Sequence, residues 1–198
     1  MRKDEIQLKT RHVNAQSGRL EDAEWIASPN FEPRPPGLVP ELIVVHGISL
    51  PPDEFGGRGV EQLFTNQLNP QEDSYYQGID GLKVSSHLFI RRGGEVIQFV
   101  DFNQRAWHAG VSCFDGRENC NDFSIGIELE GADHIAYTAS QYDSLASVVL
   151  ALQQAYPSLH NKAVVGHSDI APGRKTDPGP LFNWAALRRL TSSDTQPN

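Results

Sequence analysis

Long hydrophobic runs and an excess of basic charge are both missing from this sequence. No segment approaches the roughly 18 consecutive apolar residues that a membrane-spanning helix needs, and residues 1–25 are too charged to supply the apolar centre of a secretory signal peptide. The 25 acidic residues outnumber the 17 lysines and arginines, and the formal net charge is −8. Nucleic-acid-binding proteins and polybasic membrane anchors need a basic face. We therefore expect a cytoplasmic protein without nucleic-acid or membrane partners.

Cysteine is also scarce, since the chain contains Cys113 and Cys120 and no others. Two cysteines are too few for a disulfide-stabilised scaffold. Their spacing permits a disulfide, but in the cytoplasm we expect two reduced structural thiols. A cysteine-based zinc site would need more ligands nearby.

The chain does contain enough apolar residues for one globular domain. Hydrophobic residues make up 38% of its 198 residues, which is typical of a folded chain and not of a disordered one. We expect a flexible N-terminal tail over residues 1–23, one domain over residues 24–190 and a C-terminal tail over residues 191–198.

Short apolar segments predict the strands of this domain. We expect buried strands at "ELIVV" (residues 41–45) and in "AVVGH", and a hairpin in "SSHLFIRRGGEVIQFV" that turns at Gly93 and Gly94. The segment "FSIGIELEG" (residues 123–131) alternates between apolar and polar residues, which predicts a strand that carries Glu128 on the face opposite its apolar side chains.

Segments with helical periodicity lie between these strands. Helices are expected at residues 60–68, in "TASQYDSLASVVLALQQAY", where Thr138 and Gln141 fit a capping box, and in "LFNWAALRRL". Strands that alternate with helices predict an α/β fold, here a single domain with a central mixed β-sheet flanked by helices.

Two histidines directly follow predicted strands, and a carboxylate stands ten positions after the second. His46 follows "ELIVV", and His167 ends "AVVGH" before a proline-rich loop that contains Asp177. Strand ends position side chains while leaving them accessible. Two imidazoles and a carboxylate, with a fourth position for water, suit a catalytic zinc ion. The alternative is that both histidines are core residues hydrogen-bonded to the backbone.

The other histidines give weaker indications. We expect His12, His134 and His160 on the surface, and His87 in a structural role, with a place behind the site residues as the alternative. His108 lies in a predicted loop, where a place in the wall of a site and a simple packing role are both open.

Three longer motifs resemble the zinc N-acetylmuramoyl-L-alanine amidases. They are "VVHGISLPPDEFGG", "RAWHAGVSCFDGRENCNDFSIGIELEG" and "GHSDIAPGRKTDPGP". The resemblance extends over roughly residues 24–190 and is greatest to the 1,6-anhydro-N-acetylmuramyl-L-alanine amidase type, the AmpD type. It implies the fold shared by phage lysozyme-type amidases and peptidoglycan recognition proteins.

The resemblance also implies roles for single residues. It assigns zinc to His46, His167 and Asp177, and it assigns assistance in catalysis to Glu128 and Lys175. By themselves these last two would be interpreted as an exposed strand carboxylate and a solvated loop lysine. Aspartate as the third ligand points to the AmpD branch, because recognition-type and phage relatives usually have cysteine there.

One departure from the pattern stands beside the first ligand. Gly47 occupies a position where the AmpD type often has asparagine. The glycine removes a side-chain hydrogen-bonding group from this place, which leaves zinc binding intact and leaves the substrate contacts there open.

The implied activity is zinc-dependent hydrolysis of a cell-wall amide. The expected substrate is a small molecule, a 1,6-anhydro-muropeptide from peptidoglycan recycling, cut between the lactyl carbonyl of the muramic acid and L-alanine. We expect a monomer. Trp107 is a candidate for stacking on the sugar, with core packing as the alternative, while Arg174 and Lys83 are candidates for binding peptide carboxylates, with surface solvation as the alternative.

Three other functions compete with this one. A recognition protein that binds peptidoglycan without cutting it typically lacks a complete metal site, whereas all the expected ligands are present here. A periplasmic amidase is disfavoured because no signal peptide is evident. A structural zinc site would need a fourth protein ligand, and the sequence offers no evident candidate.

Overall fold

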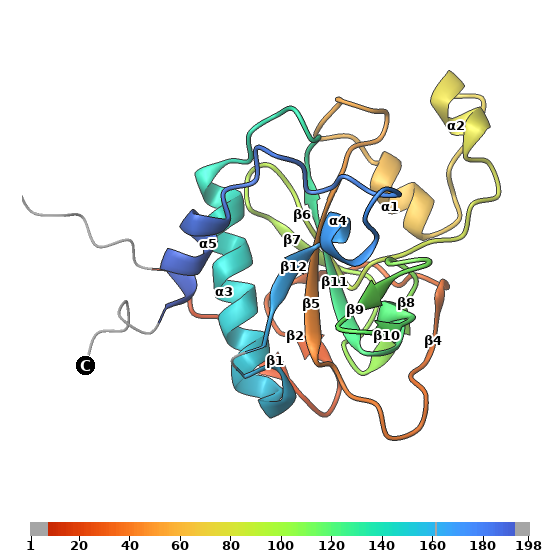
Figure 1. Cartoon of the computed structure of the whole chain (residues 1–198). Coiled ribbons are helices and arrows are strands. Elements are labelled where there is room, and N and C mark those ends of the chain that lie inside the picture. The colour runs from red at the N-terminus through yellow and green to blue at the C-terminus, as the bar shows by residue number, and fades with distance from the viewer. Residues whose placement is uncertain (1–7, 161, 193–198) are drawn as a thin grey trace, which may run out of the picture.

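Helices cover both faces of a central β-sheet in the computed structural model, which describes residues 8–160 and 162–192 (Figure 1). The strands are β1 (Val13–Asn14), β2 (Arg19–Leu20), β3 (Glu24–Trp25), β4 (Phe31–Pro33), β5 (Leu42–Ile48), β6 (Leu88–Ile90), β7 (Val96–Gln98), β8 (Gln104–Ala106), β9 (Cys113–Phe114), β10 (Arg117–Glu118), β11 (Ser124–Glu130) and β12 (Val164–Gly166). The α-helices are α1 (Gly59–Phe64), α2 (Ser74–Gly78), α3 (Ala139–Ala155), α4 (His167–Ile170) and α5 (Trp184–Thr191), and the 3₁₀ helices are η1 (Cys120–Asp122) and η2 (Pro157–Leu159).

The central sheet has six strands in the order β12-β5-β11-β6-β7-β3. Strands β12, β5, β11 and β6 run parallel to one another, β7 runs antiparallel to β6 in the predicted hairpin, and β3 runs parallel to β7. The sheet is therefore mixed, as the sequence predicts. The parallel strands β12, β5 and β11 lie side by side, so their carboxyl ends meet at the same edge of the sheet.

Alternation along β11 divides its side chains between two sides of the sheet. Ile125, Ile127 and Leu129 join a core cluster with Leu145 and Val149 of α3. The intervening residues point to the opposite side, as the sequence predicts. That side is covered too, because all seven residues of β11 are buried.

The helices show where local signals define an element well and where they do not. The capping box before α3 is present, with Thr138 Oγ1 accepting a hydrogen bond from the Gln141 backbone and Gln141 Oε1 accepting one from the Thr138 backbone, both at 3.1 Å. Helix α1 is shorter than predicted. It ends at Phe64, and Asn66 then adopts a left-handed conformation with φ of 58°.

The expected N-terminal tail is wrong for residues 8–23. Leu20 is only 3% exposed and belongs to the main core. Buried Arg11 donates a hydrogen bond to Ser147 of α3 at 3.0 Å and forms an ion pair with Asp22 at 2.7 Å. The sequence of this segment is polar because charged and hydroxyl groups make the contacts that anchor it. Residues 1–7 lie outside the described residues, as do residues 193–198 of the expected C-terminal tail, whose first residue, Thr191, still belongs to α5.

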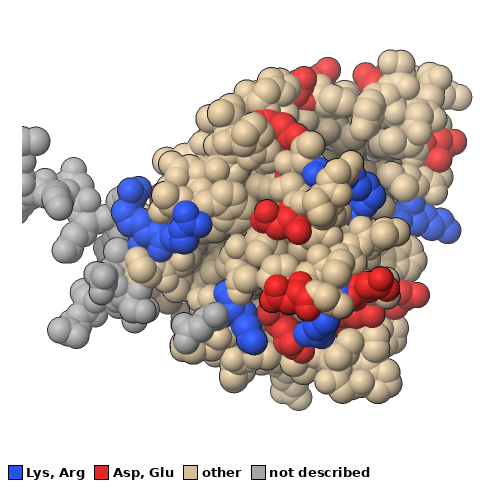
Figure 2. Space-filling model, viewed as in Figure 1, with Lys and Arg blue, Asp and Glu red and all other residues tan. Residues whose placement is uncertain are grey.

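No helix in the described part of the chain combines the length and apolarity needed to cross a membrane. On the face shown in Figure 2, acidic side chains lie among basic ones, with a small basic group over α5. The two cysteines are free thiols, Cys113 exposed and Cys120 buried.

Candidate metal centre and active site

Three neighbouring strands bring the predicted metal ligands and Glu128 together. His46 is the fifth residue of β5, so it lies within this strand and not after it. Glu128 is its register partner on β11. His167 begins α4 immediately after β12, the strand on the other side of β5. These side chains come from distant positions in the sequence, and the pairing of the strands places them side by side.

Asp177 completes the group from the loop that follows α4. Its Oδ2 lies 3.2 Å from Nδ1 of His46 and 3.1 Å from Nδ1 of His167, and the two Nδ1 atoms are 2.9 Å apart. The loop is tied back by the Ser168 backbone, which donates to the Asp177 carbonyl at 3.0 Å, and by the Tyr137 hydroxyl, which donates to the Pro178 carbonyl at 3.0 Å.

His46 and Asp177 are in the protonation states that a cation needs. Burial lowers the pKa of His46 to about 4, so its ring is neutral at pH 7. Burial acts to raise the pKa of Asp177, but the close contacts of its carboxylate with the imidazoles of His167 and His46 outweigh burial and hold this pKa well below its usual value. At neutral pH the site therefore presents the neutral imidazole of His46 beside the carboxylate of Asp177.

The spacing of these atoms fits a small divalent ion. In a tetrahedral zinc site with bonds of 2.0–2.1 Å, neighbouring ligand atoms lie about 3.3 Å apart. The separations of 2.9, 3.1 and 3.2 Å found here are close to that value. Among the described residues these three form a group of potential metal ligands whose ligand atoms lie within 4.8 Å of one another. The donor set of two nitrogens and one oxygen is the type that zinc accepts.

Glu128 lies at the edge of this group with an unused oxygen. Its Oε1 is 4.0 Å from Nδ1 of His46, and its residue is 8% exposed. Its Oε2 is one of the buried side-chain atoms in the described part of the chain that have no hydrogen-bond partner. Burial, followed by the charge of Asp177, raises the pKa of Glu128 well above its usual value. A buried carboxylate oxygen without a partner is costly for stability, which marks it as a group reserved for a ligand or a proton.

Lys175 lies close enough to influence this group electrostatically. Its side chain is exposed, and its positive charge acts to lower the pKa of both His46 and Glu128. The structure therefore places Lys175 near the ligands, although the carboxylate and the imidazoles make the close contacts among themselves.

The three predicted substrate contacts lie at different distances from this centre. Arg174 is nearest, with Nη2 3.4 Å from Nε2 of His167, and it donates to the carbonyls of Ala109 at 2.6 Å and Val111 at 2.7 Å. Half-buried Trp107 donates from Nε1 to Glu32 at 3.3 Å. These contacts show that Arg174 supports the loop that carries Ala109, in addition to any contact with substrate.

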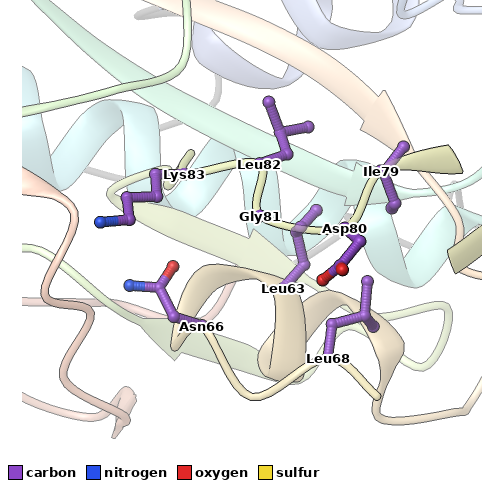
Figure 3. A pocket seen from close by; sticks show the side chains of 8 residues that line it. All are labelled: Leu63, Asn66, Leu68, Ile79, Asp80, Gly81, Leu82 and Lys83. Atoms are coloured by element: carbon purple, nitrogen blue, oxygen red, sulfur yellow. The ribbon is translucent and has the colours of Figure 1, made fainter. Parts of the chain in front are cut away.

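Lys83 belongs to a separate surface groove. The groove lies between α1 and the segment after α2, and Figure 3 shows Lys83 on its rim. None of the metal ligands lines it; its lining residues are Leu63, Asn66, Leu68, Ile79, Asp80, Gly81, Leu82 and Lys83. The structure thus does not bring Lys83 together with the other candidate site residues.

Two residues near the centre had no clear role in the sequence. His108, for which two roles were open, lies against His46, with 2.9 Å between His46 Nε2 and His108 Nδ1. Tyr137 carries no local signal, since it precedes a helix in a polar segment. Its hydroxyl occupies the space beside Gly47: a Cβ built on Gly47 would collide with the Tyr137 oxygen. The space that a side chain at position 47 would need is therefore filled by Tyr137.

Comparisons with known proteins show the family of this chain. The sequence profile of the N-acetylmuramoyl-L-alanine amidase family matches residues 36–180. The 1,6-anhydro-N-acetylmuramyl-L-alanine amidase AmpD of Escherichia coli K12 is 53% identical over 91% of this chain and 98% of its own length, and the AmpD of Haemophilus influenzae is 47% identical over 85% and 92%.

Solved structures give the same result. A crystal structure of selenomethionine AmpD superposes with a TM-score of 0.87 at 52% identity, covering 91% of this chain and 99% of its own. AmpDh3 of Pseudomonas aeruginosa in complex with anhydromuramic pentapeptide has a TM-score of 0.55 at 27% identity, covering 83% of this chain and 65% of its own. The family profile matches most of the domain, and AmpD proteins align with this chain over almost their whole length. This chain therefore belongs to the N-acetylmuramoyl-L-alanine amidase family.

Proposed function

We propose that this chain is a zinc-dependent amidase of peptidoglycan recycling. It hydrolyses the amide bond between the lactyl group of 1,6-anhydro-N-acetylmuramic acid and L-alanine in muropeptides. The observation that carries the proposal is the group of His46, His167 and Asp177 beside an unpartnered Glu128 oxygen, in a chain 53% identical to an AmpD amidase. The anhydromuramic pentapeptide bound by AmpDh3 supports the substrate class.

His46 and His167 would hold the ion through their Nδ1 atoms and Asp177 through Oδ2, because these three atoms face one another. When bound, zinc supplies a Lewis acid that polarises the scissile carbonyl and lowers the pKa of water.

Glu128 moves the proton. Its unpartnered Oε2 accepts a proton from the attacking water and then delivers it to the amine of L-alanine as the amide bond breaks. Its position on a buried central strand holds the carboxylate in place during both transfers.

Lys175 stabilises negative charge. Its exposed ammonium group acts electrostatically on His46 and Glu128, and a single donor to a developing oxyanion typically contributes about 3 kcal/mol. Trp107 and Arg174 are proposed substrate contacts, and an unchanged KM in an Arg174→Ala variant would remove Arg174 from substrate binding. The structure offers less support for Lys83, which lies in the groove beside α1.

The test compares two substrates with and without metal. Purified protein is incubated with 1,6-anhydro-muropeptide and with intact peptidoglycan, each with and without a chelator, and released peptides are identified by mass spectrometry. We expect a peptide that begins with L-alanine from the anhydro-muropeptide, lost with chelator and restored by zinc. Binding without cleavage would indicate a recognition protein and contradict the proposal.

The cellular setting is a separate part of the proposal. We infer a monomer that acts in the cytoplasm on recycled fragments, in line with the similarity to AmpD proteins. Cell fractionation and size-exclusion chromatography with light scattering would test the two parts separately.

A further inference from the structure

A line of hydrogen bonds leads from the backbone of η1 to the metal ligand His46. The Ser124 hydroxyl lies 2.5 Å from the carbonyl oxygen of Cys120. Its oxygen also lies 3.1 Å from Nε2 of His108, whose Nδ1 lies 2.9 Å from Nε2 of His46. All four residues are buried.

The direction of these bonds follows from their first member. A carbonyl oxygen can only accept, so Ser124 donates its one proton to Cys120. Ser124 must then accept from His108, which places the His108 proton on Nε2 and a lone pair on Nδ1. That lone pair accepts the Nε2 proton of His46. A neutral His46 therefore carries its lone pair on Nδ1, the atom that faces Asp177 and His167.

We propose that His108, held by Ser124, is a positioning residue that fixes the tautomer and ring orientation of the metal ligand His46. The inference rests on the metal site of the proposed function. His108 does not touch the ion or the substrate in this arrangement. It acts through His46, as outer groups that orient metal-binding histidines do in general.

The surrounding structure is built to hold the His108 ring in this place. The backbone nitrogens of His108 and Ala109 both donate to Oδ1 of Asn121, at 3.1 and 2.8 Å. Gly126 on β11 leaves room for the ring, since a Cβ there would lie 2.6 Å from Nδ1 and 2.7 Å from Cδ2 of His108. The His46 and His108 rings meet edge to face, with centroids 5.0 Å apart.

The second imidazole ligand is oriented differently. Nε2 of His167 lies 3.0 Å from the carbonyl of Ala109, which can only accept, so a neutral His167 has one tautomer available in this contact. His46 faces another imidazole, which can either donate or accept. The tautomer of His46 therefore depends on the Ser124 hydroxyl, two hydrogen bonds away.

The decisive variant is Ser124→Ala, which removes the acceptor without touching His46. Its matched control is Ser112→Ala, since the Ser112 hydroxyl also makes two hydrogen bonds, to the carbonyl of Gly110 and from the backbone of Cys120, but has no link to His46. Side-chain ¹⁵N shifts in metal-free protein report the tautomers directly. Chelator competition gives the zinc affinity.

We expect wild-type protein and Ser112→Ala to show His46 and His108 protonated at Nε2. Ser124→Ala should show mixed tautomers and a loss of zinc affinity of about tenfold, the lower end for removing such an outer partner. A wild-type His46 protonated at Nδ1, or an unchanged zinc affinity in Ser124→Ala, would overturn the inference.

Two substitutions of His108 separate hydrogen bonding from packing. His108→Asn keeps a short side chain whose amide oxygen can accept from His46, whereas His108→Leu fills space without accepting. A higher zinc affinity in His108→Asn than in His108→Leu supports the inference. An equal loss of zinc affinity in these two variants, at similar thermal stability, contradicts it. Wild-type protein that binds no zinc would refute the proposed metal site itself, so the two failures are distinguishable.

Discussion

Burial leaves Oε2 of Glu128 without a hydrogen-bond partner and raises the pKa of this residue. The same burial therefore destabilises the fold and leaves the carboxylate free to exchange a proton. We expect Glu128→Gln to keep zinc binding and to lower kcat by about 10²–10⁴-fold, the range that a positioned general base contributes. Chelator competition measures whether zinc binding is kept, and turnover of anhydro-muropeptide measures the decrease in kcat. Turnover within a few-fold of wild type would exclude Glu128 from the proton transfers.

Gly47 and Tyr137 form a second pair that acts at the residue scale. We expect Gly47→Ala to destabilise the protein by about 1–3 kcal/mol, the usual range for an inserted methyl group in a packed site, because the new Cβ meets the Tyr137 hydroxyl. In a Tyr137→Phe background the nearest ring atom would be Cζ, at 3.6 Å, so the same change should cost less. Urea unfolding of the four proteins in a double-mutant cycle measures the coupling, and additive effects would show that the two residues do not share this space.

At the scale of elements, the N-terminal hairpin is held to α3 by Arg11. We expect Arg11→Met to lower the free energy of unfolding by about 1–3 kcal/mol, because the change leaves the buried Ser147 hydroxyl without its donor and breaks an ion pair with Asp22. The control is His12→Ala at the exposed neighbouring position. Chemical denaturation compares them, and equal stability would mean that this contact does not anchor the segment.

Elements defined by local pattern are the ones that the sequence predicts well. The alternation of β11, the apolar run of β5 and the capping box of α3 lie within a few residues each, and the structure confirms them. The contacts of Arg11 depend on a partner 136 positions away, and the expectation of a flexible tail failed there.

The candidate site divides in the same way. His46, His167 and Asp177 stand out because strand ends and a proline-rich loop mark them locally, and their side chains do meet. The contacts of His108 and Tyr137 arise from packing across the sheet, which no local spacing reports. The role of Glu128 required the family resemblance, since an alternating strand shows only which way a side chain points.

For the whole molecule, buried histidines should make the metal-free protein sensitive to acid. Burial lowers the pKa of His46 to about 4 and of His87 to about 3, and lowers that of His108 well below its usual value. Between pH 6.5 and 4.5 the unfolded chain binds these protons and the folded chain does not, so stability falls as pH falls, by about 1.4 kcal/mol per pH unit for each proton. Glu128 has a raised pKa and binds a proton in the folded state, so its effect on the pH dependence of stability opposes that of one of the three histidines.

Because Glu128 opposes the histidines, a Glu128→Gln variant tests the same prediction a second time. In the presence of chelator, urea unfolding at pH 7, 6 and 5 should show decreasing stability for the wild-type protein and a steeper decrease for Glu128→Gln. A flat profile for both proteins, or the same slope, would contradict the assignment of these groups as neutral histidines and a protonated carboxylate in the fold.

The residues that would grip the ion are separated by 131 positions, from His46 on β5 to Asp177 beyond α4. A chain emerging from the ribosome therefore has an incomplete set of ligands until nearly all of the domain has been synthesised, and β12 must dock before His167 reaches its place. Metal loading would then mark the end of maturation, and a truncated or misfolded copy would stay inactive toward the cell's own wall fragments.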